Sequence, residues 1–451
     1  MSLGLSALGL LLAVLPRGEG SNPRVTLSHW SRPVLTLMRS PIVWLGLGLL
    51  VYVSVQGLNS AWRFAIDANS WWLDEVAHVS WLPSGVDAPF SRSNPWRALT
   101  IWGSLGLLLC SVTIGFQRRR SYLTLFIILA SNAGLLGLLG LIQRLSAAKG
   151  IFWFYVPSND QFISSFIYPN HAGPYFNLML ALSAGLALRA FDRTQRRLLP
   201  RGSATFFVGC ATFVAIAIVL SHSRMSIAIL LLLMSLMGLA VFWSLIRRRQ
   251  PGRSRRQFLP LLLVVIGFLA IGVLVVSGSK NRERFIRVAS DPSAQTLDRT
   301  LLRQAAVDML GDRWVWGWGA GCFRHAFPLF AQKYPEIYYS RHAGTKYWEH
   351  AHCDLLQFPV ELGAVGITPV LSILGYSVYQ LRRCRFWQNS VSLCIAMGCA
   401  LVLLHSAVDF VFQNPAVLLT WSLLLLAAIR CKKLDSPLRA RRFNQRADVR
   451  S

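Results

Sequence analysis

The sequence contains little charge, and acidic residues are especially scarce. Its 451 residues include 46 lysines and arginines but only 19 aspartates and glutamates, and charged residues make up 14% of the chain. Soluble domains carry roughly a quarter of charged residues, so the composition excludes that class. Hydrophobic residues reach 54% and mean hydropathy is +0.45. Apolar runs of roughly 20 residues, the length that spans a bilayer, recur along the chain and predict an all-α polytopic membrane protein with about 10–12 transmembrane helices.

The chain also lacks a continuous basic face, although its formal net charge is +27. Its basic residues form short clusters between apolar runs, which is the distribution of the positive-inside rule rather than that of a nucleic-acid-binding surface. We therefore expect a lipid bilayer and no nucleic acid among its partners. The clusters are Arg118 to Arg120, Arg189 to Arg201, Arg247 to Arg256, Arg382 to Arg385, and the tail from Arg430 to Arg450.

Metal-type cysteine spacings, internal repeats and low-complexity segments are missing as well. Most of the eight cysteines lie in or beside apolar runs, where they behave as small hydrophobic residues. No Walker-type lysine accompanies the glycines at 317–321. We expect no metal and no cofactor. Cys322 and Cys353 fall in a polar segment, where a disulfide between them could form.

Alternating the apolar runs across a bilayer gives a consistent topology. With Arg24, Arg32 and Arg39 in the cytoplasm, every strong basic cluster falls on that same side. A further run, Leu3 to Leu15, could be a first span, a poor signal sequence or an over-called start, and the residues leave this open. The predicted spans lie near 41–58, 97–116, 121–143, 174–190, 204–221, 225–246, 258–277, 355–379, 391–411 and 415–430.

Three longer segments face outward in this topology. Segments 59–96 and 144–173 are rich in tryptophan and proline, and we expect parts of them to lie along the membrane surface. Segment 278–354 mixes acids and bases and is expected to be folded, with a helix from Leu297 to Leu310. The domain organisation we predict is an N-terminal transmembrane region, a transmembrane core that includes segment 278–354, and a basic cytoplasmic tail, at residues 1–160, 161–430 and 431–451.

Polar residues in apolar context mark candidate sites, because they are costly in a membrane. The first group is Ser221 to Arg224, at an outer helix end that should be poor in arginine. The planar fork of Arg224 suits a phosphate or carboxylate, although a snorkelling interfacial arginine is an equal alternative. The second group is Tyr168 to Ala172, in which Asn170 is expected to cap the following helix and His171 is a weaker candidate.

The third group lies in segment 278–354 and just after it. Asp298 is a plausible helix N-cap, and Arg299 and Arg303 lie one turn apart on one face. In a helix His350 and His352 would point apart by about 200°, so a shared metal is not expected. A single histidine acting as a general base is the simpler hypothesis.

The fourth group lies at the outer end of a late span. His405 and Asp409 are expected one helical turn apart, so Asp409 could orient the imidazole of His405. Structural pairing inside a helix bundle is an equal alternative.

These residues resemble the motifs of the O-antigen ligase family, which also includes O-antigen polymerases and some protein glycosyltransferases. His352 to Gly363 resembles its His-Asn-x-x-Leu-Gln-x-x-x-Glu-x-Gly signature, with Cys353 in place of the asparagine. Arg299 followed by the glycines at 317–321 and Phe323 resembles its Arg…Pro-x-x-Gly-x-Gly-x-x-Phe segment, with Val315 in place of the proline. Weaker likenesses are Ser223-Arg224, Ser165 to Asn170, and Ser406 to Asp409, so that the resemblance covers roughly residues 160 to 425.

The resemblance implies transfer of a glycan from an undecaprenyl-diphosphate carrier to a glycolipid or glycan acceptor at the periplasmic face of the bacterial inner membrane, without a metal. It implies His352 as the base on the acceptor hydroxyl, and Arg224 and Arg299 as ligands of the diphosphate. Glu361 is expected to support helix packing or the surroundings of the site. His350, Arg303 and His171 are weaker candidates for contact with substrate.

Several alternatives stay open. An O-antigen or exopolysaccharide polymerase and a protein glycosyltransferase of the same family differ from a ligase in the acceptor, which one sequence does not identify. An alternative of another class is a transporter of lipid-linked glycans. A transporter predicts inverted repeats and broken helices at the bilayer midplane, whereas the polar groups here gather at one face.

Overall fold

The computed structural model describes residues 35–67, 71–157, 162–195, 200, 202–247, 293–340, 344–345 and 348–433, together with Gly4 and Ser6. The chain forms two compact units that interleave along the sequence. Unit 1 comprises residues 1–121, 294–384 and 406–415, and unit 2 comprises residues 122–293, 385–405 and 416–451. The predicted span 258–277, most of the run Leu3 to Leu15 and most of the basic tail lie outside the described residues.

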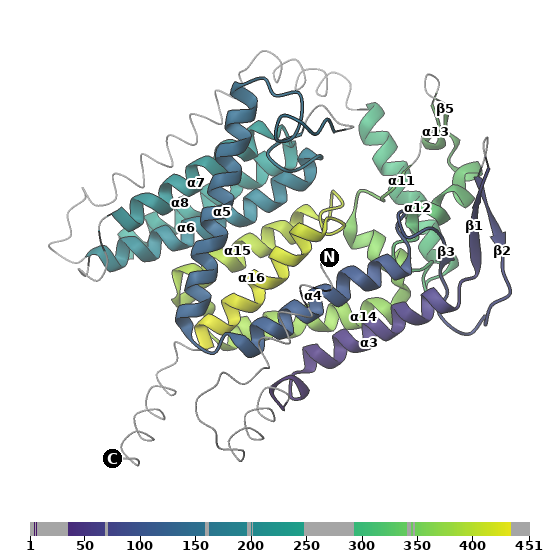
Figure 1. Ribbon diagram of the computed structural model, residues 1–451, viewed down its shortest axis with the longest axis horizontal. Coiled ribbons are helices and arrows are strands. Elements are labelled where there is room, and N and C mark those ends of the chain that lie inside the picture. Colours follow the sequence, from purple (N-terminus) through teal and green to yellow (C-terminus); the bar gives the residue numbers. More distant parts are fainter. Residues whose placement is uncertain are drawn as a thin grey trace. The chain divides into compact units, whose positions relative to one another are not determined.

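Three long apolar helices form the membrane part of unit 1, and each is long and apolar enough to cross a bilayer. They are α3 (Pro41–Leu58), α4 (Pro95–Gly115) and α14 (Asp354–Arg383). Both α3 and α4 begin with proline, whose missing N–H costs nothing at the first helical position. Asn94 caps α4 by accepting a hydrogen bond from the Arg97 backbone N–H. Helix α3 packs against both α4 and α14 (Figure 1).

The ends of these helices differ in charge. The Gln56 side chain, near the end of α3, donates to the carbonyl of Glu361 in the first part of α14, so the two helices run antiparallel. The end of unit 1 where α3 begins and α14 finishes therefore carries Arg39, Arg382 and Arg383. The opposite end carries a folded extramembrane part.

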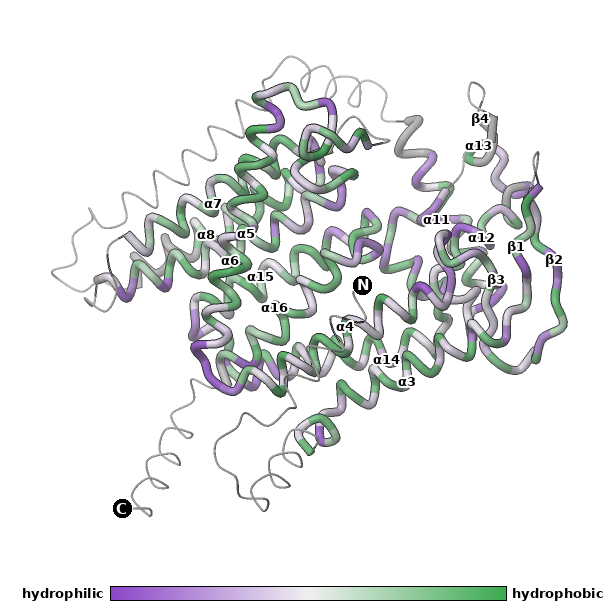
Figure 2. The backbone as a smooth tube through the Cα atoms, in the orientation of Figure 1, coloured by the Kyte–Doolittle hydropathy of each residue, from purple (hydrophilic) through white to green (hydrophobic). Residues whose placement is uncertain are grey.

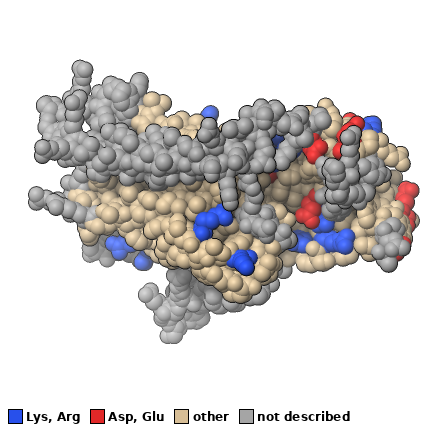
Figure 3. All heavy atoms as spheres, turned by 90° about the horizontal axis from the view of Figure 1, so that it is seen from above, with Lys and Arg blue, Asp and Glu red and all other residues tan. Residues whose placement is uncertain are grey.

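The extramembrane part of unit 1 contains two small sheets and several helices. In the first sheet, β1 pairs antiparallel with β2, with Trp62 opposite Glu75, and parallel with β3. Exposed acidic side chains gather at this end of unit 1, as Figure 3 shows from one side. The elements are β1 (Trp62–Ile66), β2 (Trp71–Glu75), β3 (Val86–Asp87), α11 (Ser293–Asp312), α12 (Phe323–Ala326), η2 (Phe327–Lys333), α13 (Pro335–Tyr338), β4 (Tyr339–Ser340) and β5 (Gly344–Thr345).

A hydrophobic core holds this part together. Helix α11 contributes Leu302, Ala305 and Met309, which are fully buried. Trp62 of β1 stacks on Trp318 with ring centroids 5.2 Å apart, so it joins the sheet to this core. The remaining buried members are Ala306, Trp318, Phe323, Ala326, Phe327, Phe330, Ile337, Ala351 and Val360.

The folded part confirms one expectation and leaves another as a prediction. Segment 59–96 is expected to lie partly along the membrane surface; Trp62 and Trp71 pack inside unit 1, where Trp71 stacks on Phe64, whereas Trp72, Trp81 and Trp96 are exposed. Alternating burial along β1 explains the strand, since Phe64 is buried between outward-facing neighbours. The prediction that segment 278–354 is folded is confirmed for its described residues by α11 to β5. The predicted helix extends from Ser293 to Asp312.

The connection between this part and α14 depends on glycine. Helix α14 is broken at Gly363, whose φ of 62° lies in the left-handed region. The chain at 314–319 runs beside the break and exchanges backbone hydrogen bonds with residues 360–365. A Cβ atom on Gly317 would lie 2.5 Å from the carbonyl oxygen of Glu361, so only glycine permits this approach. Gly317 and Gly363 therefore allow two backbone segments of the protein to lie in direct contact.

Unit 2 is a bundle of apolar helices (Figure 2). Helix α6 packs against α7, α8 and α15, and most of its residues are buried. Helices α5, α6 and α7 are long and apolar enough to span a bilayer, and α8, α15 and α16 contain shorter apolar stretches. The elements are α5 (Arg119–Leu145), α6 (Pro169–Gln195), α7 (Gly202–Leu220), α8 (Arg224–Arg247), η3 (Phe386–Gln388), α15 (Ser390–His405) and α16 (Pro415–Lys433).

The architecture confirms the prediction of an all-α polytopic membrane protein. Two details differ in unit 2. The span expected at 391–411 ends as a helix at His405, because residues 406–408 form turns before Pro415 starts α16. Asn170 is not an N-cap, because α6 already begins at Pro169 and Asn170 lies in its first turn. The domain boundaries expected at residues 160 and 430 stay predictions.

Candidate functional site

The site of interest lies in unit 1, where the extramembrane part enters α14. His352 has a φ of 51°, a left-handed conformation that is costly for a residue with a Cβ atom. Cys353 follows as the N-cap residue, and α14 starts at Asp354. Strain of this kind persists only where the surrounding contacts impose it, and it is concentrated at functional sites.

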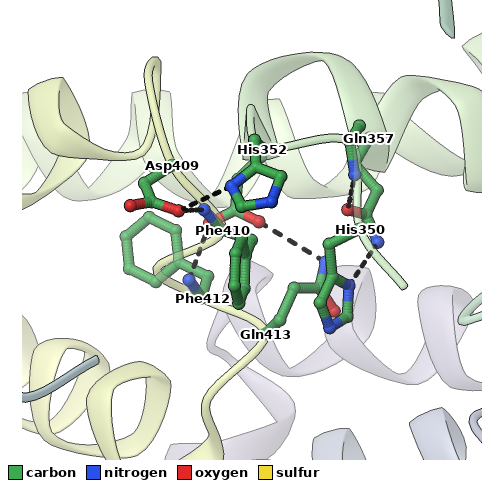
Figure 4. A network of polar contacts seen from close by, with 9 residues as sticks. His350, His352, Gln357, Asp409, Phe410, Phe412 and Gln413 are labelled. Atoms are coloured by element: carbon green, nitrogen blue, oxygen red, sulfur yellow. Dashed lines mark hydrogen bonds and ion pairs between the residues drawn. The ribbon is translucent and has the colours of Figure 1, made fainter. Parts of the chain in front are cut away.

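His352 pairs with a carboxylate that is distant in sequence. Its Nδ1 lies 3.3 Å from Oδ1 of Asp409 (Figure 4). The side chain of Asp409 is 7% exposed and that of His352 is 21% exposed, so the carboxylate is enclosed while the imidazole still reaches solvent. A neutral imidazole that donates from Nδ1 carries its free electron pair on Nε2. The arrangement therefore orients a basic nitrogen.

Asp409 is itself held in place by the start of α14. The backbone N–H of Asp354 donates to the carbonyl of Ser406 at 2.8 Å. The Asp354 carboxylate in turn accepts a hydrogen bond from the Phe412 backbone N–H at 2.7 Å. Hydrogen bonds thus connect segment 406–412 to α14 on both sides of Asp409. The Asp409 carboxylate also accepts a hydrogen bond from the backbone N–H of Phe410.

Aromatic rings surround the histidine pair. Phe410 meets the ring of His352 edge-on, with centroids 4.6 Å apart, and stacks on His350 at 4.7 Å. Trp348 meets His352 from another direction at 5.7 Å. The imidazoles of His350 and His352 therefore both pack against Phe410.

His350 has a different chemical environment from His352. The Oε1 atom of Gln357 accepts the backbone N–H of Ala351, which fixes the orientation of the Gln357 amide. The Nε2 atom of Gln357 then donates one hydrogen bond to the Glu361 carboxylate at 2.8 Å and one to Nδ1 of His350 at 3.2 Å. Nδ1 of His350 is therefore an acceptor, and the proton of its neutral ring lies on Nε2. The network favours His352 over His350 as the base.

Glu361 has a structural position in this network. It is 2% exposed, and its second carboxylate oxygen accepts the backbone N–H of Gly321 at 2.9 Å. It therefore joins the glycine-rich segment to Gln357. Gln357 in turn contacts His350 (Figure 4). This position agrees with a supporting role.

Arg299 and Arg303 lie on α11 in the same unit, within the helix. Arg299 is exposed and Arg303 is half-buried. Asp298 is not an N-cap, because α11 begins five residues earlier at Ser293.

The other sequence candidates belong to unit 2. Arg224 is exposed as the first residue of α8 and follows a tight turn in which His222 has a φ of 55°. His171 lies in the first turn of α6, with its ring at the edge of the Tyr168 ring. His405 is fully buried as the last residue of α15.

Two expectations about pairs are wrong. His405 and Asp409 are not one helical turn apart, because the helix ends at His405, and the imidazole beside Asp409 is that of His352. Cys322 and Cys353 are both free thiols. Sγ of Cys322 instead accepts the backbone N–H of Val86.

Sequence reasoning missed the partnership of His352 with Asp409. The two residues are 57 positions apart, and no periodicity connects them. The role of Gln357 was also missed, although its position four residues before Glu361 on a helix was a usable signal.

The chain was also compared with known protein families and with curated proteins. No curated protein matches the chain. A family model described as O-antigen ligase matches residues 209–371, a range that contains Arg224, Arg299 and His352. The match supports a glycosyltransferase-like activity of the O-antigen ligase and polymerase kind in a multi-pass membrane protein. Over residues 209–371, the chain is therefore similar to the O-antigen ligase family.

Proposed function

We propose that the protein transfers a glycan from an undecaprenyl-diphosphate carrier to the hydroxyl of a glycolipid or glycan acceptor, with His352 as the general base. The observation that carries the proposal is the contact between His352 Nδ1 and Asp409 Oδ1, in a position where the imidazole remains accessible. A carboxylate at Nδ1 fixes the tautomer and orientation of the ring, so that Nε2 is left as the proton acceptor.

The reaction needs few chemical groups from the protein. Nε2 of His352 takes the proton of the acceptor hydroxyl, and the oxygen bonds to the anomeric carbon of the donor sugar. The bond from that carbon to the diphosphate oxygen breaks, and undecaprenyl diphosphate leaves with the electron pair. Because the leaving group is already activated, the protein contributes position, charge neutralisation and a base. Arg224 and Arg299 are proposed to neutralise the diphosphate, as bidentate donors to its oxygens.

The distribution of charge supports a periplasmic site. Arg39, Arg382 and Arg383 lie at one end of the helices of unit 1, and the His352 segment lies at the other. The positive-inside rule assigns the basic end to the cytoplasm. We therefore propose an inner-membrane protein with His352 at the periplasmic face.

The ligase is the first candidate because the family description favours it. A polymerase or a protein glycosyltransferase would use the same base and a different acceptor. The glycolipids that accumulate in a deletion strain distinguish two of these activities. Long unattached chains indicate a lost ligase, whereas single repeat units indicate a lost polymerase.

Two measurements test the proposal itself. A strain carrying only His352→Ala should reproduce the deletion phenotype while the protein remains inserted in the membrane. Topology reporters fused after residues 224 and 352 should both report the periplasm. Reporters on opposite sides of the bilayer would rule out a common site.

A further inference from the structure

The segment that joins α5 to α6 contains two tight turns, and the second of them packs inside unit 2. In this turn Ile163 and Phe166 exchange backbone hydrogen bonds, and both side chains are buried. The Gln143 side chain, near the end of α5, donates to the carbonyl of Ser164 and holds the turn against the helix. The joining segment can therefore bury apolar side chains where they serve the core.

The first turn is a hairpin over residues 150–156, and its apolar side chains point outward. Ile151 and Tyr155 exchange backbone hydrogen bonds at 2.8 and 3.0 Å, which closes the hairpin. The rings of Phe152 and Phe154 stack with centroids 6.2 Å apart. Five consecutive side chains are between 44% and 80% exposed, namely Phe152, Trp153, Phe154, Tyr155 and Val156. Packing within the described protein does not explain this run.

The backbone at the tip of the hairpin makes these residues more unusual. Phe152 and Trp153 have φ angles of 52° and 67°, in the left-handed region. Hairpin turns with two such residues favour asparagine and glycine, which adopt this conformation at low cost. Neither backbone preference nor core burial accounts for two aromatic side chains here, which leaves contact with a partner outside the described protein.

The hairpin lies over the lipid-facing side of α5. Ile128, Leu135 and Ile142 are exposed along this helix, and residues seven apart differ by only about 20°, so they form one stripe. The backbone N–H of Ser146 donates to the carbonyl of Ile142, which places Ser146 about 40° from that residue. The indole N–H of Trp153 donates to Oγ of Ser146 at 2.9 Å. The aromatic hairpin is therefore continuous with the apolar stripe of a helix that is long enough to cross a bilayer.

The chemistry of the hairpin fits a lipid surface better than a sugar. Phe154 and Val156 are the two most exposed side chains of the run, and neither carries a polar atom that could bind a hydroxyl group. Trp153 and Tyr155 each combine an apolar ring with one polar atom, as residues at the headgroup level do. Lys149 is exposed just before the hairpin and adds a cation suited to lipid phosphates.

We propose that the hairpin 150–156 is an interfacial anchor, whose aromatic tip inserts into the bilayer beside the end of α5. Helix α5 begins with Arg119 and Arg120, which the positive-inside rule assigns to the cytoplasm, so the anchor enters the outer leaflet. Insertion fixes the depth at which α5 ends and at which the turn 163–166 is held. The anchor takes no part in proton transfer, and its existence does not depend on the proposed function.

The test places a photoreactive side chain on the hairpin of the full-length protein. Phe154 is replaced by p-benzoylphenylalanine, and the protein is illuminated in nanodiscs of phosphatidylethanolamine and phosphatidylglycerol. Mass spectrometry of the peptides should detect phospholipid adducts at a yield similar to that from the same replacement of Leu135, the control on the lipid-facing stripe. Replacement of Lys333, which is exposed beside Asp308 in the extramembrane part of unit 1, should give at least about tenfold fewer adducts.

The cross-linked product decides between the possible partners. Phospholipid adducts at position 154 support the anchor, and the same replacement of Val156 should give them independently. Cross-links from position 154 to another part of the chain or to a second copy would overturn the inference, as would an adduct yield no higher than at position 333. With a lipid-linked glycan in the nanodiscs, capture of its sugars in preference to phospholipid would also overturn it and would assign the hairpin to substrate binding.

Discussion

The two units of the protein differ most in where they hold carboxylates. Among the described residues, unit 2 contains a single acidic side chain, Asp192 near the end of α6, whereas unit 1 encloses Asp354, Glu361 and Asp409 beside its membrane helices. Buried carboxylates are costly at the edge of a bilayer and persist only with partners or a function. The comparison agrees with our proposal that the base belongs to unit 1, whereas Arg224, the proposed diphosphate ligand of unit 2, is the first residue of a helix.

The largest effect is expected from the base in unit 1. His352→Ala should reduce glycan transfer about a thousandfold, within the range for loss of general base catalysis, because it removes the imidazole that pairs with Asp409. The rate is measured with purified protein and a lipid-linked donor. His78→Ala, in the same extramembrane part, serves as the control. If His352→Ala still transferred glycan at more than a tenth of the normal rate, His352 would not be the base, and the proposed difference between the two units would be wrong.

The second effect concerns the backbone of unit 1. Gly363→Ala should destabilise the protein by about 3 kcal/mol, because alanine is strained at a φ of 62° and its Cβ would collide with the carbonyl of Val315. Thermal unfolding in detergent measures the change. Gly375→Ala, on the same helix, has open space around its Cβ and should leave the midpoint unchanged. Equal midpoints for the two variants would show that the break in α14 is not required.

The third effect is a dependence of stability on pH. His325 is fully buried, its Nε2 contacts the carbonyl of Ser93, and burial lowers its pKa from 6.5 to about 4. The unfolded chain therefore binds a proton between pH 6.5 and 4 that the folded protein excludes. The free energy of unfolding should therefore be highest above pH 6.5. It should fall by up to about 3 kcal/mol as the pH drops to 4, and it should not change further below that pH.

A variant without the titrating ring isolates this effect. His325→Gln can still donate to Ser93 and has no proton to gain, so its unfolding midpoint should change less over the same pH range. The same acid sensitivity in both proteins would assign it to other groups.

The smallest effect is expected in unit 2. Arg224→Lys should slow transfer about tenfold through weaker donor binding, because an ammonium does not reproduce the bidentate fork. Transfer rates at varied donor concentration measure the change. Identical kinetics would mean that Arg224 only anchors the start of α8 at the bilayer surface.

The sequence predicts most of the membrane fold, because the signal is local. Runs such as 41–58 and 355–379 lie close to α3 and α14, since a bilayer requires length and apolarity that composition reveals directly. Composition does not separate the tryptophans of β1 and β2. Trp62 and Trp71 pack within the sheet and its core, whereas Trp72 is exposed.

The candidate site was predicted as residues but not as a geometry. His352 and Glu361 were identified because their spacing with Gln357 and Gly363 resembles a family motif. The partner of His352 was missed, because Asp409 reaches it through turns that begin where α15 ends, and sequence periodicity stops at such an end.

The central claim, that Asp409 and His352 act as one unit, is tested most directly by a double-mutant cycle on the transfer rate. Asp409→Asn alone should slow transfer about a hundredfold or more through loss of the oriented, basic imidazole. Added to His352→Ala, the same change should have almost no further effect. If the two losses multiply, Asp409 acts independently of His352 and the proposed base is wrong.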